Sequence, residues 1–152
     1  MASGRIGVAT GCARRRRARS RARGVLERRD AKVRSHGHTL RRLDDAQLHA
    51  LRIQIKKLRY AADSFGALFD AAAVRGLEDN LSRLQDVLGE INDINVAQRQ
   101  VVAALAGRRG RALREVRKLR AALAAWHDAR TAALRRKLRS AWRGYRHAGK
   151  FW

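Results

Sequence analysis

LHALRIQIKKLRY, residues 48–60, repeats large apolar side chains at intervals of three and four residues. That spacing places them on one face of an α-helix, where a partner surface can bury them. The pattern continues to Phe65 and Phe69, so the sequence predicts one helix over residues 46–69. Asp44 and Asp45 stand directly before it and supply the N-cap chemistry and negative charge that favour a helix start.

Three further segments show the same periodicity, and no segment alternates as a β-strand does. They are residues 22–43, 74–106 and 111–147. Gly107-Arg108-Arg109-Gly110 separates the last two, as expected for glycine just past a helix end. The chain contains no proline, the residue that most often breaks a helix. The predicted fold class is therefore all-α, an antiparallel up-and-down four-helix bundle with long helices.

The first 21 residues differ in composition from the rest of the chain. Small residues are followed by a run of Arg, Ala and Ser, so we interpret residues 1–21 as an arginine-rich flexible leader. Residues 22–152 then form one bundle domain. The single Cys12 has no partner for an intrachain disulfide, which favours a reducing, cytoplasmic location. Because no apolar segment approaches the length of a membrane span, membrane insertion is not expected.

Positive charge dominates the chain, with 36 Lys and Arg against 13 Asp and Glu and a formal net charge of +23. Such an excess is costly in self-repulsion unless polyanions are the usual neighbours. Residues 44–106 are the exception, with seven basic and nine acidic residues. Four of those seven cations fall between residues 52 and 59, so this cluster is more informative than the basic flanks.

The cations of the 46–69 helix share one face. With 100° per residue, His49, Arg52, Lys56 and Arg59 fall within an arc of about 100° that borders the apolar face. An ordinary solvated face would lie opposite the core. Guanidinium and ammonium groups in a row of about 15 Å suit several linked phosphates. A neutral His49 would also gain a proton more readily once phosphate is bound, which predicts tighter binding in mild acid.

Other candidate contacts lie on neighbouring helices. Arg28 and Lys32 border the apolar stripe predicted for residues 22–43: Val25, Arg29, Val33, His36, Leu40 and Leu43. They are expected to face the cations of the 46–69 helix across one groove. Arg130 falls on the apolar stripe of the 111–147 helix, where a guanidinium must be paired, bound to an anion or turned outward.

Aromatic and acidic residues separate the possible activities. Tyr60 and Trp126 are expected in helix seams, so no stacking platform for nucleobases is predicted. Nonspecific nucleic-acid binding still follows from the charge and is the alternative function. An enzyme acting on phosphate chains would need carboxylates for a metal ion or a positioned nucleophile, and the cationic face holds neither. We therefore predict a binding protein with no catalytic residue, metal or cofactor.

Two motifs resemble the CHAD family, the conserved histidine α-helical domain. The first is LHALRIQIKKLRYAADSF, whose matching positions are His49, Arg52, Lys57, Leu58, Arg59, Tyr60 and Asp63. The second, RLQDVLGEINDINVA from Arg83, is similar to the family's Leu-Gln, Leu-Gly and Asn-Asp signature. The resemblance extends to Trp126 and the closing AWRGYRHAGKFW, and so covers about residues 22–152.

The resemblance implies a non-catalytic module whose basic surface binds inorganic polyphosphate, with some members on polyphosphate granules. It also adds Lys57 to the candidate contacts. The family fold has two four-helix bundles, whereas this chain resembles only the second and is about half the usual length. Either one bundle suffices, or a homodimer restores the two-bundle platform, or the chain is part of a longer protein.

Overall fold

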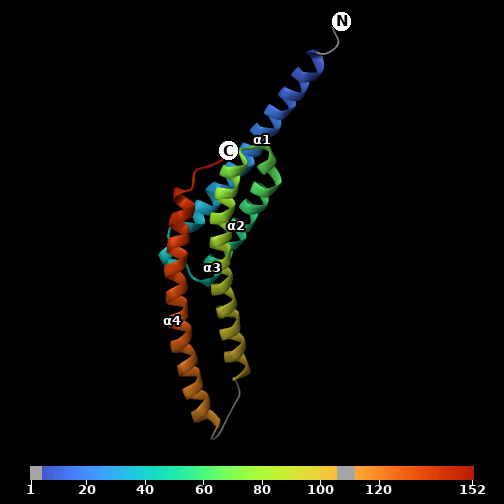
Figure 1. Ribbon diagram of the computed structural model, residues 1–152. Helices are drawn as coiled ribbons and strands as arrows, with labels where there is room; N and C mark the ends of the chain where they lie inside the picture. The colour runs from blue at the N-terminus through green and yellow to red at the C-terminus, as the bar shows by residue number, and fades with distance from the viewer. Residues whose placement is uncertain (1–4, 106–111) are drawn as a thin grey trace.

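Helices form almost all of the structure, a computed structural model that describes residues 5–105 and 112–152 (Figure 1). In chain order the α-helices are α1 (Arg5–Gly37), α2 (Asp45–Phe65), α3 (Ala71–Ala104) and α4 (Ala112–His147). Two short 3₁₀ helices, η1 (Leu40–Arg42) and η2 (Gly66–Leu68), lie before and after α2. Strands are absent from both described ranges, so the all-α prediction is confirmed.

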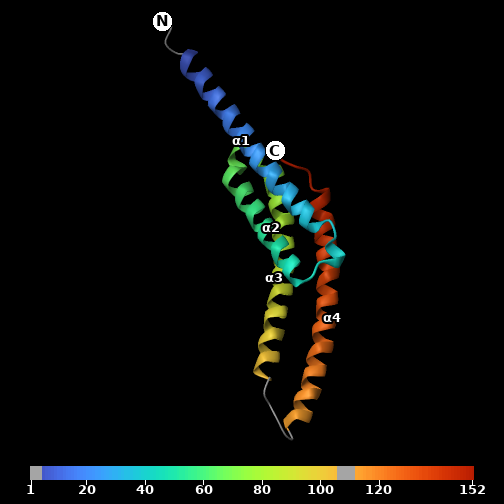
Figure 2. The ribbon, with the colours of Figure 1, turned by 180° about the vertical axis from the view of Figure 1, so that it is seen from behind.

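Consecutive helices run in opposite directions and pack side by side (Figures 1 and 2). Contacts join α1 to α2, α2 to α3 and α3 to α4, which confirms the up-and-down bundle. The helices overlap unequally. α1 begins beyond one end of the bundle, and α3 and α4 continue together past α1 and α2 at the other end (Figure 2).

The core lies where all four helices overlap. The apolar face that was predicted for α2 is buried, and the buried residues of the other helices meet it. Across all four helices, the largest fully buried apolar side chains are Leu26, Val33, Leu51, Ile55, Leu58, Leu81, Leu84, Leu88, Leu134, Leu138 and Tyr145. Burying one such side chain stabilises the fold by about 1.5–3 kcal/mol, so these faces dictate how the helices meet.

The apolar residues near the far ends of α3 and α4 do not continue this core. Val102 is 38% exposed, Leu119 49% and Trp126 59%. α1 and α2 end before they reach this region, so two helices remain there without a second layer (Figure 1). The prediction that Trp126 lies in a buried seam is therefore wrong.

The arginine-rich segment is part of α1, which begins at Arg5 and not at residue 22. Arg and Ala, which dominate residues 13–21, are strong helix formers and favour the continuous helix. Side chains from Ala13 to Arg21 are exposed, and Cζ of Arg19 lies 5.1 Å from the ring centroid of Phe69. Residues 5–21 therefore lie in the first turns of α1, and Arg19 among them contacts the bundle.

The first residues of α2 and α3 are capped by side chains next to them in the sequence. Asp44 accepts the Gln47 backbone N–H at 2.8 Å, and the Gln47 side chain accepts the Asp44 N–H at 2.9 Å. This capping box confirms the predicted start of α2. Asp70 caps α3 by accepting the N–H of Ala73 at 2.9 Å. The predicted stop at residues 107–110 lies outside the described residues.

A buried carboxylate ties the end of the chain to α1. Asp30 is 1% exposed, and it accepts hydrogen bonds from the Tyr145 hydroxyl and from Nε of Arg34 at 2.8 Å. Burial, and then the bond to Asp30, raise the pKa of Tyr145 far above its ordinary value. One turn before Asp30, Glu27 accepts Lys150 Nζ at 2.6 Å and Trp152 Nε1 at 2.7 Å.

Candidate anion-binding site

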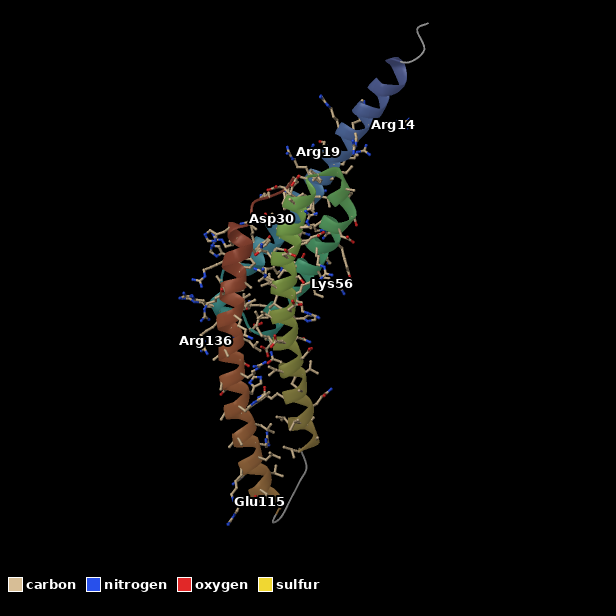
Figure 3. All side chains as sticks on the ribbon, viewed as in Figure 1. Arg14, Arg19, Asp30, Lys56, Glu115 and Arg136 are labelled. Atoms are coloured by element: carbon tan, nitrogen blue, oxygen red, sulfur yellow. The ribbon has the colours of Figure 1, made fainter. Side chains whose placement is uncertain are left out.

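The cationic face of α2 lies beside α3, as its place next to the apolar seam predicts. His49, Lys56, Lys57 and Arg59 are exposed, and Arg52 is half-buried. Lys56 points outward from α2 in Figure 3. The folded helix therefore presents these side chains to solvent along the α2–α3 boundary, with Lys57 on the flank of α2 turned away from it.

Carboxylates of α3 share this boundary with the cations. Arg52 and Lys56 line a hollow of about 480 Å³, and the other lining residues belong to α3: Gln85, Asp86, Gly89, Glu90 and Asp93. Two cations thus face three carboxylates. A phosphate that entered this hollow would meet repulsion as well as attraction, which helical periodicity along α2 alone does not reveal.

Two of the predicted contact residues already hold partners on α3. Nη1 of Arg59 donates to Oε1 of Gln85 at 2.6 Å. Nη2 of Arg130 lies 3.1 Å from Oε2 of Glu90. Arg130 is exposed and ion-paired, which is one of the outcomes expected for a guanidinium on that stripe.

His49 lies at a second hollow along the same boundary. This hollow measures about 470 Å³ and includes Asp45, Asn92, Asn95 and Arg99. Arg99 brings a further cation to the end of the α2 row. Gln85, Asn92 and Arg99, which follow one another at seven-residue spacing on α3, therefore line the hollows beside α2.

Tyr60 was predicted to be in the core, and this is wrong. The side chain is 55% exposed, and Nζ of Lys56 lies 5.6 Å from its ring centroid. A cation over an aromatic ring at this distance is weakly attracted to it. Tyr60 therefore belongs to the exposed α2 face and helps to hold Lys56.

Arg28 and Lys32 do not border the core of α1. The buried residues of this helix are Ala22, Leu26, Asp30, Val33 and Gly37, a stripe displaced from the predicted one. Both cations are exposed, and neither lines the hollows beside Arg52 and His49. The structure thus leaves the predicted groove of facing cations between α1 and α2 without support.

Sequence reasoning missed a second basic surface on α4. Arg136, Arg139, Arg143 and Arg146 follow the same spacing of three, four and three residues as His49, Arg52, Lys56 and Arg59. The signal was therefore available, but the overall basicity of residues 107–152 concealed it. In Figure 3, Arg136 and Lys56 lie on opposite flanks of the molecule.

Within residues 5–105 and 112–152, no group of three His, Cys, Asp or Glu side chains could hold a metal ion. None of the helices in those ranges combines the length and the apolar character needed to cross a bilayer.

Comparison with known proteins identifies the family. The family model for the CHAD domain matches residues 8–102, which is more than half of the chain. This range begins inside the arginine-rich turns of α1 and ends within α3, so the likeness predicted around Trp126 and the closing residues lies outside it. No curated protein and no solved structure shows significant similarity to the chain. On the family match, the chain belongs to the CHAD domain family.

Proposed function

We propose that this protein is a non-catalytic module that binds inorganic polyphosphate. CHAD domains are associated with polyphosphate binding in general, and the family match supports the same ligand class here. The net charge of +23 supports an anionic partner independently of the family.

The α2 face is the observation that carries this proposal. Its cations lie within the matched range and form a row about 15 Å long, and all of them are exposed after folding except Arg52, which is half-buried. The carboxylates of α3 repel phosphate, so the chain is expected along the outer edge of the row. The proposed contacts are His49, Arg52, Lys56, Lys57 and Arg59.

The residues on the neighbouring helices have supporting roles in this proposal. Arg130 neutralises Glu90 through its ion pair and so reduces the repulsion at the α2–α3 hollow. Arg28 and Lys32 add long-range attraction from the exposed side of α1. A cytoplasmic site of action, which the single Cys12 favours, is part of the same proposal, as is attachment to polyphosphate granules, which the family resemblance implies.

Nucleic acid is the competing ligand because the same charge attracts any phosphate backbone. Exposed Tyr60 and Trp126 are the features that favour it, since bases can stack on open aromatic rings. They lie on α2 and on the far part of α4, however, and do not form a shared platform. We therefore rank nucleic acid second.

The proposal is tested by competition at about 0.15 M salt, where nonspecific electrostatic attraction is screened. Labelled long-chain polyphosphate is displaced by unlabelled polyphosphate, duplex DNA or RNA. The proposal is supported if unlabelled polyphosphate displaces the probe at a much lower concentration of phosphate groups than DNA or RNA does. Displacement at the same concentration by all three competitors contradicts it.

A variant then tests the α2 face. Replacing Arg52, Lys56 and Arg59 together by alanine should weaken polyphosphate binding, since three cationic contacts are lost. The matched control replaces Arg14, Arg15 and Arg17, which are exposed on α1 and remove the same charge. If the control loses binding and the α2 variant retains it, the arginine-rich turns of α1 are the site.

A further inference from the structure

A hollow of about 610 Å³, called the α1–α4 hollow below, lies between the α1–α2 connection and α4. It lies on the flank marked by Arg136 in Figure 3, away from the α2 face. Six arginines line it: Arg41, Arg42, Arg136, Arg139, Arg143 and Arg146. Among the described residues that line it, none is acidic.

The two walls of this hollow are joined by specific contacts. Nη1 of Arg135 donates to the backbone carbonyl of Leu43 at 3.0 Å, which fixes the α1–α2 connection against α4. Leu40 and Leu43 are buried in the core on one side, and Trp142 is buried on the other. Gly37 makes room for the Trp142 ring, since a Cβ at Gly37 would overlap it. The fold therefore fixes the backbone of the two walls relative to each other, and with it the positions from which the arginines extend.

None of these six guanidinium groups forms an ion pair with a carboxylate within the described part of the chain. On α4, arginines three and four residues apart repel one another and weaken the free helix. A bound anion would convert that repulsion into attraction. Unneutralised arginines around a preformed hollow are thus the arrangement expected of an anion site.

The contrast with the α2–α3 hollow decides which surface attracts phosphate more strongly. The α2–α3 hollow has two lining cations against three carboxylates, of which Glu90 is paired with Arg130, whereas the α1–α4 hollow has six lining cations against no carboxylate among the described residues. At comparable distances the electrostatic field of the second is far more favourable to a multiply charged anion.

The lining also restricts the chemical class of the ligand. Guanidinium groups present planar pairs of donors that match phosphate oxygens. Trp142 is only 7% exposed, so its indole ring offers little surface on which a nucleobase could stack, and the exposed imidazole of His38 is the other ring in the lining. The arginines of the hollow therefore favour anionic oxygens, and the row of about 15 Å on α4 suits several phosphates in sequence.

We infer that the α1–α4 hollow is a second binding site for condensed phosphate, separate from the α2 face and tighter than it. This inference rests on the proposed function, because it takes polyphosphate as the ligand of the protein. Four of its six arginines lie outside the range that matches the family, since Arg136, Arg139, Arg143 and Arg146 all follow residue 102. The two arginines of the other wall, Arg41 and Arg42, lie inside that range.

The test is isothermal titration of the full chain with inorganic tripolyphosphate at about 0.15 M salt. The principal variant is Arg143→Ala/Arg146→Ala, both exposed. Its matched control is Arg114→Ala/Arg117→Ala, which removes two exposed arginines at the same spacing about 43 Å earlier on α4. Loss of two cationic contacts should weaken the tighter class of sites at least about tenfold, while the control stays within about twofold.

A second variant tests the other wall and guards against misfolding of α4. Arg41→Ala/Arg42→Ala should weaken the same class of sites, and circular dichroism checks that each variant keeps its helices. The α2 variant Arg52→Ala/Lys56→Ala should reduce only the weaker class.

Three outcomes would contradict these expectations. Unchanged tight binding in the Arg143/Arg146 variant overturns the inference while leaving the proposed function intact. Equal losses in that variant and in the Arg114/Arg117 control overturn it as well, because binding would then follow total charge. If the wild-type protein binds tripolyphosphate and long-chain polyphosphate no better than duplex DNA, the proposed function fails and this ligand fails with it.

Discussion

Gly37→Ala is the sharpest test of how the α1–α4 hollow is built. An alanine Cβ at this position would lie 2.7 Å from Cζ3 of Trp142, and closer still to Cζ2 and Cη2. Ordinary contacts begin at 3.4 Å. The ring would therefore have to withdraw by about 0.7 Å at Cζ3 and by more at the other two atoms, as the difference between these distances requires.

The surroundings of Trp142 resist that movement. Its ring is 7% exposed and lies 5.3 Å from the ring of Tyr145, which is itself hydrogen-bonded to Asp30. Overpacking of this kind costs about 1–3 kcal/mol. Alanine gains up to about 1 kcal/mol over glycine within a helix, and less at the last residue of α1. We expect a net loss of about 1–2 kcal/mol, or about 2–8 °C in melting temperature.

Denaturant unfolding followed by circular dichroism measures this change, with Gly76→Ala as the control. Gly76 lies within α3, and a Cβ there would meet nothing within 4 Å. The control should therefore gain about 0.5–1 kcal/mol from helix propensity. A Gly37→Ala variant as stable as the wild type would show that the Trp142 ring moves freely, and would refute the account of a fixed hollow. Reduced tripolyphosphate affinity should accompany the loss of stability.

Three further predictions concern polar groups of the fold. Asp30→Ala leaves the buried hydroxyl of Tyr145 without its acceptor and should lower the free energy of unfolding by about 2–4 kcal/mol; a change below about 1 kcal/mol in denaturant unfolding would contradict this. Asp44→Ala removes the cap of α2 and should lower the same quantity by about 1 kcal/mol, with less helical circular dichroism as a second readout. Hydrogen bonds from Lys150 and Trp152 lower the pKa of Glu27 below its unfolded value of about 4.5. Ionised Glu27 therefore stabilises the fold above that unfolded pKa, and this stabilisation is lost as the pH falls through the lower folded pKa. Thermal melts between about pH 3 and 7 should thus show a shallower acid decline for Glu27→Gln than for the wild type, and parallel curves would refute the assignment.

The four-helix bundle could be predicted from the sequence because the features that specify each helix lie within or next to that helix. The apolar repeat of α2 and the cap at Asp44 both lie within a few residues of the helix they specify. α1 was less predictable, because its buried stripe contains Asp30 and Gly37 in place of large apolar residues. Their reasons for burial, Tyr145 and Trp142, lie more than one hundred residues away. The displacement of that stripe removed Arg28 and Lys32 from the predicted groove.

Burial also depends on where neighbouring helices end, which periodicity does not reveal. Leu119 and Trp126 continue the repeat of α4 but stand exposed because α1 and α2 stop short of them. Tyr60 on α2 is also exposed, although it stands at the edge of the apolar repeat. A repeat therefore predicts the direction of a side chain more reliably than its burial.

The strength of an anion site depends on the opposite wall, and this separates the two cationic rows. His49, Arg52, Lys56 and Arg59 on α2 have the same spacing as the four arginines that begin at Arg136 on α4. A helical wheel therefore treats the rows as equivalent. Folding then places carboxylates of α3 beside the first row and two more arginines beside the second. Since charges at contact distance dominate the local field, the equivalence ends once the helices pack, and the α4 row becomes the stronger attractor of phosphate.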